Sequence, residues 1–335
     1  MGLHERADLH RPVEAVYSGS VEFVGVHLCV RPGEPSKGGH AGSAPTVMNI
    51  NNFFAEGILN GHVAFVTGGG TGITGGVARA LAEAGANVAL VSRSIEHLEP
   101  AAKAINEARG TSPTPGSPAG QPGWGGAVRE GSAITGEAFA IAADVRKPEE
   151  VEKAIAAAVE RFGKIDIVVN GAAGNFLCAA EELSPNGFGT VVDIDLKGTF
   201  NVCRAAFAEL KRNRGQILNI SATLHYLGTP MQLHVSAAKA GVDALTKNLA
   251  VEWGRYGIRT NAIAPGPIED TEGMQRLVPE PIKERLRKRI PLGRFGLIKD
   301  IECAAVFLCS DAASFINGAI LVVDGGQWMA GNRLG

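Results

Sequence analysis

Residues 62–73 read His-Val-Ala-Phe-Val-Thr-Gly-Gly-Gly-Thr-Gly-Ile, a short apolar run that ends in a glycine-rich turn. The apolar run predicts a buried strand, and residues 75–84 after the turn have the pattern of a helix. Glycines at a strand-to-helix turn let the backbone approach a pyrophosphate, whose charge the amino end of the helix favours. Glycines also close ordinary turns. We expect a dinucleotide site with contacts from Thr67, Gly68, Gly69, Gly70, Thr71, Gly72 and Ile73.

Strand and helix signals alternate from this turn to the end of the chain. Strands rich in Val, Ile and Ala that alternate with helices are typical of a parallel sheet covered on both faces. The sequence therefore predicts an α/β fold over residues 59–335, a single Rossmann-type doubly wound parallel sheet with helices on both faces. The predicted strands are 62–66, 88–91, 138–142, 165–169, 216–220, 259–263 and 319–323, and the predicted helices are 75–84, 95–108, 149–162, 188–212 and 236–256, with more between 279 and 310.

Two segments depart from this alternation. Residues 1–58 have no helical period and are expected to form an irregular N-terminal extension, in which 21–30 could be a short strand. Residues 110–136 are rich in Gly, Pro and Ser, a composition that cannot bury a core, so a surface insertion is expected.

Composition excludes several classes of function. The chain has 335 residues, of which 45 % are apolar and 20 % charged, so a core is available and wholesale disorder is excluded. A net charge of −2 gives no reason to expect a nucleic acid as partner. No apolar run is long enough to span a membrane. The five cysteines have no paired spacing and no neighbouring histidine cluster, so neither a disulfide framework nor a metal site is expected.

The end of the second strand indicates which dinucleotide is bound. An NAD site usually has an acid there for the ribose 2′-hydroxyl, whereas this chain has Ser92-Arg93-Ser94. A guanidinium can face a 2′-phosphate, so NADP(H) is the expected cofactor, unless Arg93 is only a solvated surface residue. Asp144, at the end of the third strand, is placed to accept from the adenine amino group, although it could simply cap the next helix.

Further motifs follow the later strands: Asn170-Gly-Ala-Ala-Gly, Ser221, Lys239, Pro265-Gly-Pro-Ile and Asp324-Gly-Gly. Together with the glycine turn they resemble the short-chain dehydrogenase/reductase family over residues 61–328. The resemblance implies that Lys239 binds the nicotinamide ribose. It implies further cofactor contacts from Asn170, Pro265, Gly266, Ile268 and Thr271.

Three positions differ from the usual pattern of that family. Val235 replaces the tyrosine that donates a proton in ketone reductases, Asp195 replaces an asparagine, and Thr74 replaces the third glycine. A branched alkyl group cannot act as a general acid. The blocks 172–178, 193–195, 221–223, 250–254 and 264–268 resemble the peroxisomal-type 2,4-dienoyl-CoA reductases, which implies NADPH-dependent reduction of 2,4-dienoyl-CoA to 3-enoyl-CoA, a step in the β-oxidation of unsaturated fatty acids.

The chemistry of that reaction suggests roles for the catalytic candidates. Hydride addition to a conjugated thioester leaves a dienolate, whose charge must be stabilised and whose α or γ carbon must be protonated. Lys239 could supply positive potential, and Asp195 could be the acid or orient a water, which requires its burial. Asp195 could instead be a structural helix residue. The resemblance adds Asp324 and Ser221, and Tyr226 lies where the substrate should pass.

Substrate contacts are expected at both ends of an acyl-CoA. Tyr226 could bind the thioester oxygen or pack on the acyl chain, and His234 could line the cleft or be a core residue. The basic stretch 270–291 could be a mobile lid that attracts phosphates or a solvated helix face. The candidate substrate residues are Arg93 and Arg146 for phosphates, Phe176, Ser184 and Asn186 from the resemblance, and Tyr226 and His234.

Two other functions remain open from the sequence. One is a different short-chain reductase that acts on a 3-oxoacyl or alcohol substrate with Tyr226 as donor, and the other is a non-catalytic nucleotide-binding scaffold. The resemblance implies a homotetramer or homodimer and a peroxisomal location, although the last residues, Asn-Arg-Leu-Gly, are not a Ser-Lys-Leu address. Mitochondrion and cytoplasm are the alternatives.

Overall fold

A single parallel sheet organises the described part of the chain. The computed structural model describes residues 54–110, 135–269, 271, 273–274 and 280–330. In this part seven strands pair in the order β3-β2-β1-β4-β5-β6-β7, and every neighbouring pair is parallel. The predicted doubly wound sheet is therefore confirmed. The strands are β1 (Val63–Thr67), β2 (Asn87–Ser92), β3 (Ala138–Ala142), β4 (Ile167–Asn170), β5 (Gln216–Ile220), β6 (Arg259–Pro265) and β7 (Ile320–Val323).

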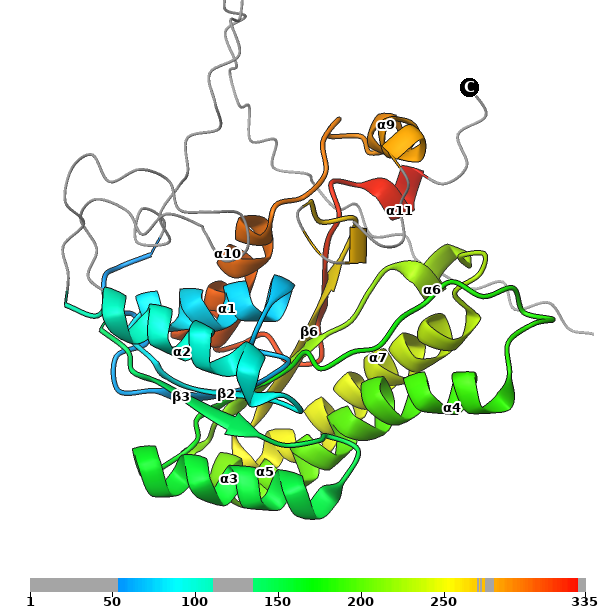
Figure 1. Cartoon of the computed structure of the whole chain (residues 1–335). Helices are drawn as coiled ribbons and strands as arrows, with labels where there is room; N and C mark the ends of the chain where they lie inside the picture. Colours follow the sequence, from blue (N-terminus) through cyan, green and yellow to red (C-terminus); the bar gives the residue numbers. More distant parts are fainter. Residues whose placement is uncertain (1–53, 111–134, 270, 272, 275–279, 331–335) are drawn as a thin grey trace, which may run out of the picture. The chain divides into compact units, whose positions relative to one another are not determined.

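Helices cover both faces of this sheet. Helices α1, α2 and α10 lie on one face, and α3, α5 and α7 lie on the other (Figure 1). The helices are α1 (Gly72–Glu83), α2 (Ile95–Ala108), α3 (Pro148–Phe162), α4 (Pro185–Val192), α5 (Gly198–Asn213), α6 (Leu224–Leu227), α7 (Leu233–Trp253), α9 (Glu280–Arg289), α10 (Ile298–Cys309) and α11 (Gln327–Ala330).

The near-continuous apolar strands follow from burial on both faces. Successive side chains of a strand point to opposite faces. In β1, Ala64 and Val66 belong to the core under α1 and α10, whereas Phe65 belongs to the core under α3 and α5. Because strand order reverses between β1 and β4, the carboxyl ends of these two strands flank the position where doubly wound sheets bind ligands.

The predicted helix over 188–212 is wrong in one respect, because the structure interrupts it. Helix α4 begins earlier, at Pro185, and is separated from α5 by a π-helical turn over Asp193–Lys197. Such a turn inserts an extra residue and changes the direction of the side chains that follow. The turn contains Asp195, which is fully buried.

Several expectations fall outside the described residues. They are the extension up to residue 53, its short strand at 21–30, and the interior of the insertion at 111–134. Phe54 and Ile58 already pack against the core, and the Leu59 amide donates to the Ala84 carbonyl at 2.8 Å. In the part of the chain described, no helix combines the length and apolar character needed to cross a membrane.

Candidate active site

The glycine turn between β1 and α1 has the backbone geometry of an anion site. Gly68 has a φ of +70°, and a Cβ there would lie 2.7 Å from the Gly171 carbonyl oxygen, so only glycine fits. Gly72, the first residue of α1, also has a positive φ of +58°. Thr71 makes no capping hydrogen bond with its side chain, which leaves the first-turn amides of α1 available to a phosphate. The residues therefore fit a dinucleotide pyrophosphate.

Thr74 is accommodated by a glycine on the facing strand end. A Cβ at Gly171 would lie 2.0 Å from Thr74 Cγ2, so the threonine methyl occupies the space next to that glycine. The Thr67 hydroxyl accepts from the Gly171 amide at 3.1 Å and the Ala172 amide at 3.3 Å. These contacts join the glycine turn to the segment that follows β4.

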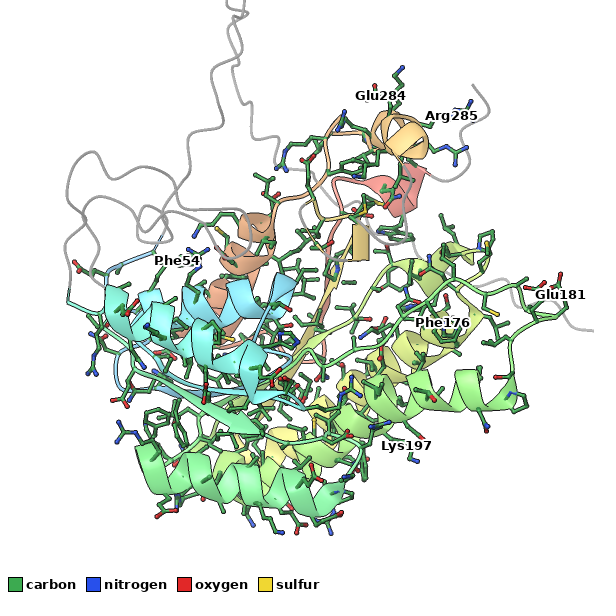
Figure 2. The ribbon with its side chains drawn as sticks, viewed as in Figure 1. Phe54, Phe176, Glu181, Lys197, Glu284 and Arg285 are labelled. Carbon is green, nitrogen blue, oxygen red and sulfur yellow. The ribbon has the colours of Figure 1, made fainter. Side chains whose placement is uncertain are left out.

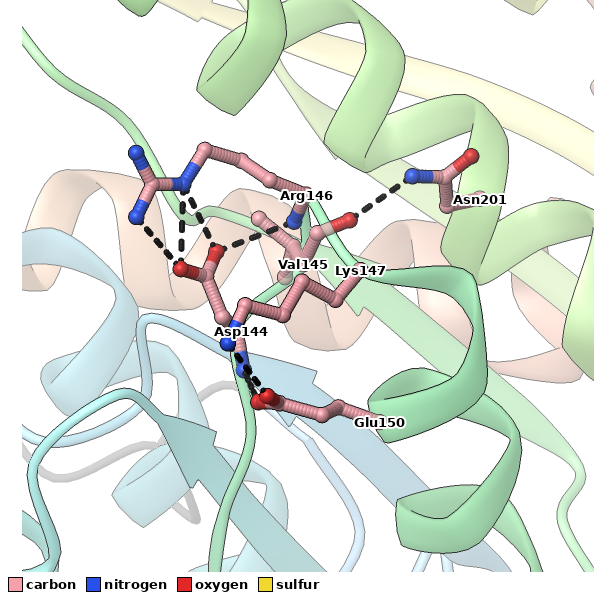
Figure 3. A network of polar contacts seen from close by, with 6 residues as sticks. All are labelled: Asp144, Val145, Arg146, Lys147, Glu150 and Asn201. Atoms are coloured by element: carbon pink, nitrogen blue, oxygen red, sulfur yellow. Dashed lines mark hydrogen bonds and ion pairs between the residues drawn. The ribbon is translucent and has the colours of Figure 1, made fainter.

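Asp144 and Arg146 bind each other at the carboxyl end of β3 (Figure 3). Arg146 Nε lies 3.0 Å from Asp144 Oδ1, and Arg146 Nη2 lies 2.5 Å from Oδ2. Hydrogen bonding by this guanidinium lowers the pKa of Asp144, and the charge of exposed Arg93 acts in the same direction. Asp144, the candidate for the adenine, and Arg146, a candidate for phosphates, are therefore close together, and their side chains already bind each other.

Lys239 and Asp195 form a buried pair. Lys239 Nζ donates to the Ile220 carbonyl at 2.9 Å and lies 3.2 Å from Asp195 Oδ2. Asp195 Oδ1 accepts from the Gly174 amide at 2.7 Å. Asp195 is 0 % exposed, as an acid role requires, but Oδ1 already accepts a hydrogen bond, and Oδ2, which has no hydrogen-bond partner among the described residues, faces the Lys239 ammonium. This arrangement favours a carboxylate that holds Lys239 in place.

Asp243 is a site residue that the sequence analysis missed. Asp243 Oδ1 accepts from the Ser221 hydroxyl at 2.5 Å, and Oδ2 lies 2.9 Å from His225 Nε2 and 3.2 Å from the Tyr226 hydroxyl. We call these four residues the Asp243 cluster. Asp243 follows Lys239 by four residues on α7, so the two share one face of the helix, and this spacing could have revealed it.

Tyr226 links this cluster to Asp324. Burial raises the pKa of Tyr226 above its ordinary value, and the charge of Asp243, its hydrogen bond and the charge of Asp324 add to this effect. The Tyr226 ring lies 5.3 Å from that of Trp328. Asp324 accepts from the Gly326 and Trp328 amides at 2.8 Å each, so it also fixes the backbone at the start of α11.

Val235 lies in an apolar contact instead of presenting a hydroxyl. It is buried and clusters with Val191, Ala238 and Phe176. Phe176, in the segment before α4 (Figure 2), stacks on His234 with ring centres 4.3 Å apart. Burial lowers the pKa of His234, whose two ring nitrogens have no hydrogen-bond partner among the described residues.

The remaining candidates lie in contacts that support the backbone. The buried Asn170 amide donates to Asn219 Oδ1 at 2.8 Å, which ties β4 to β5. The Ser184 hydroxyl caps α4, and Asn186 is exposed in its first turn. No described contact joins Ser184 or Asn186 to the Asp243 cluster.

The segment after β6 also lies at this end of the sheet. Pro265 ends β6, and a Cβ at Gly266 would lie 2.5 Å from Asp324 Cβ. Thr271 Oγ1 donates to the carbonyl of buried Ile268 at 2.9 Å. The expected lid at 270–291 is described only in part, and its helix α9 ends in Arg287, Lys288 and Arg289. No group of three or more metal-ligating side chains is found in the described ranges.

Two family models match the chain in adjacent parts. A model described as short chain dehydrogenase matches residues 62–114, and a model described as enoyl-(acyl carrier protein) reductase matches residues 122–327. The break between the two matches falls inside the expected Gly/Pro-rich insertion at 110–136.

Similar proteins cover most of the chain. A peroxisomal 2,4-dienoyl-CoA reductase ((3E)-enoyl-CoA-producing) of Saccharomyces cerevisiae is 47 % identical over 279 residues, which cover 83 % of this chain and 88 % of that protein. A protein of the same description from Arabidopsis thaliana is 43 % identical, and the match covers 84 % of this chain and 89 % of that protein. Among solved structures, a short chain dehydrogenase from Bacillus anthracis has a TM-score of 0.66 at 39 % identity, and the match covers 80 % of this chain and 96 % of that one.

Proposed function

This chain belongs to the short-chain dehydrogenase/reductase family, and on that basis we propose that it reduces 2,4-dienoyl-CoA thioesters to 3-enoyl-CoA with NADPH, in the β-oxidation of unsaturated fatty acids. One observation carries the proposal. The site combines a buried Lys239–Asp195 pair with an apolar Val235 at the position of the tyrosine acid. Ketone reduction needs that acid at the carbonyl oxygen, whereas reduction of a conjugated thioester needs a proton at carbon.

The residues around Lys239 suit stabilisation of a dienolate. NADPH, when bound, supplies the hydride. The buried Lys239 ammonium supplies positive potential where negative charge develops, and Asp195 and the Ile220 carbonyl hold its position. Preorganised charge of this kind lowers the barrier because it needs no reorganisation during the reaction.

We assign proton delivery to the Asp243 cluster rather than to Asp195. Asp243 binds three protic side chains, and two of them, His225 and Tyr226, are only partly buried. These groups could pass a proton from solvent to the dienolate, which completes the addition of one hydride and one proton. Asp324 adds negative charge near Tyr226 and shapes the same region.

The preference for NADPH over NADH rests on Arg93. It is exposed directly after β2, and its guanidinium is near enough to Asp144 to affect the pKa of that carboxyl. No acid stands between Val91 and Ser94 to bind a ribose 2′-hydroxyl. A 2′-phosphate beside the Arg93 guanidinium would be stabilised.

Compartment and assembly complete the proposal. The relatives from yeast and Arabidopsis are named peroxisomal, which supports a peroxisomal location for this chain. We also propose that copies pair through α5 and α7, on which Phe200 is 51 % exposed and Val251 is 82 % exposed. Light scattering of the purified protein should give the mass of a homodimer or homotetramer, and a monomer would contradict this part.

The proposed activity is tested by NADPH consumption. The purified protein should oxidise NADPH with trans-2,trans-4-decadienoyl-CoA in a saturable manner and give no comparable rate with a 3-oxoacyl-CoA of equal length. Activity on the 3-oxoacyl-CoA alone would support a ketone reductase that uses Tyr226 as its acid. Binding of NADPH without turnover on either compound would support a non-catalytic nucleotide-binding protein.

A further inference from the structure

Side chains from two helices hold the segment that carries Asp144 and Arg146. From α3, Glu150 Oε2 accepts from the Asp144 amide at 2.9 Å. From α5, Asn201 Nδ2 donates to the Val145 carbonyl at 2.9 Å (Figure 3). The backbone of this segment, Asp144–Lys147, is therefore fixed by groups that lie 6 and 56 residues away in the sequence.

The Asn201 contact acts on one particular peptide unit. The Val145 carbonyl and the Arg146 amide belong to the same planar group, in which the C=O and the N–H point in opposite directions. The Arg146 amide donates to Asp144 Oδ1 at 3.0 Å. Because Asn201 fixes the oxygen of this unit, it also fixes the direction in which the N–H meets the Asp144 carboxylate.

Packing against the start of α5 supports the same peptide unit. A Cβ at Gly198 would lie 2.6 Å from Val145 Cγ2, and the Val145 side chain is buried. Gly198 directly follows the π-helical turn that contains Asp195. The hydrogen bond to Asp144 raises the pKa of Arg146, and the charge of Asp193 in that turn adds to this effect. The helix that begins beside the reaction centre thus also supports the segment assigned to the adenosine end.

We propose that Asn201 is a positioning residue for nucleotide binding, which acts through the Val145–Arg146 peptide to orient Asp144 and Arg146. The inference rests on the proposed function only in taking a nicotinamide adenine dinucleotide as ligand. Since the adenine is common to NADPH and NADH, loss of the Asn201 amide weakens both coenzymes by the same factor. Loss of the Arg93 charge, in contrast, weakens only NADPH.

Asn213 provides a matched control on the same helix. Its Nδ2 donates to the Ile165 carbonyl at 2.9 Å, and the bond is partly buried, as is that of Asn201. Ile165 precedes β4 and lies at the amino end of the strands, away from the glycine turn. Asn201→Ala and Asn213→Ala therefore remove the same kind of bond from the two ends of α5.

The test is a fluorescence titration of both variants with NADPH and with NADH, together with KM, kcat and melting temperature. Asn201→Ala should weaken both coenzymes about fivefold, as expected for one hydrogen bond, with kcat within about twofold of wild type. Asn213→Ala should lower the melting temperature similarly and leave both Kd values unchanged. Equal weakening by the two variants, no weakening by Asn201→Ala, or weakening of NADPH alone would overturn the proposal. The titration needs no thioester, so it stands even if dienoyl-CoA turnover fails.

Discussion

Replacement of Asp243 by asparagine tests the assigned proton path. The substitution keeps the size of the side chain but replaces one acceptor oxygen with an NH₂ group. In the least disruptive orientation, the amide oxygen takes the place of Oδ2 and accepts from His225 and Tyr226. The NH₂ group then faces the Ser221 hydroxyl. All three hydrogen bonds then lose the contribution of the carboxylate charge.

The expected loss of stability follows from those three bonds. A hydrogen bond to a charged group contributes roughly 1.5–3 kcal/mol, against about 1 kcal/mol for a neutral one. Asp243→Asn should therefore lower the free energy of unfolding by about 3 kcal/mol, which corresponds to a fall in Tm of about 5 °C for a domain of this size. Turnover on the dienoyl-CoA should fall by about a hundredfold, the usual contribution of general acid–base catalysis.

Two assays separate a chemical role from a structural one. NADPH titration should give an unchanged Kd, since the cluster is not part of the glycine turn. Tyrosine absorbance should show Tyr226 ionising at lower pH in the variant, because the charge of Asp243 and its hydrogen bond help to raise the pKa of Tyr226. Glu252→Gln, an exposed change on the same helix, serves as control and should alter neither property. Turnover within about threefold of wild type, with an unchanged tyrosine titration, would refute the assigned proton path.

Three other predictions follow from the same contacts. Asp195→Asn should lower kcat and reduce the free energy of unfolding by about 3 kcal/mol in urea denaturation, because the buried Lys239 loses its counter-ion; unchanged stability would contradict the pairing. Arg93→Ser should weaken NADPH binding at least about tenfold and NADH binding less than about twofold, and equal weakening would remove the 2′-phosphate assignment. Because burial lowers the pKa of His234, the unfolded state takes up a proton that the folded state does not as pH falls through about 6.5. The free energy of unfolding should therefore fall more between pH 7 and 5 in wild type than in His234→Phe, by up to about 1.4 kcal/mol per pH unit. Parallel curves of unfolding free energy against pH for the two proteins would contradict this.

The strands could be predicted closely from the sequence. The ends of β1 and β6 differ from the predicted ones by no more than two residues, because strands buried on both faces are continuous apolar runs bounded by polar or glycine residues. The break between α4 and α5 could not be predicted in the same way. A π-helical turn differs from an α-helix by one extra residue within a hydrogen-bonded ring. This difference does not change the residue composition of the helix, so composition and periodicity do not reveal it.

The site was predictable where a residue matches a position of the family that the sequence resembles. Lys239 and Asp195 were identified in that way, and the structure pairs them. Asp243 was missed because it belongs to none of those motifs, although its spacing from Lys239 carries the information. The pairing of Asp144 with Arg146 was missed because each was given a separate ligand, whereas the turn over Asp144–Lys147 brings the two side chains together.

The most direct test of the central claim is to run the reaction in D₂O with unlabelled NADPH and identify the product by mass spectrometry and NMR. The account predicts a 3-enoyl-CoA that carries one deuterium from solvent at the α carbon and one unlabelled hydrogen from NADPH at the far end of the former diene. Conversion of a 3-oxoacyl-CoA to a 3-hydroxyacyl-CoA, with no change in the dienoyl-CoA, would contradict it.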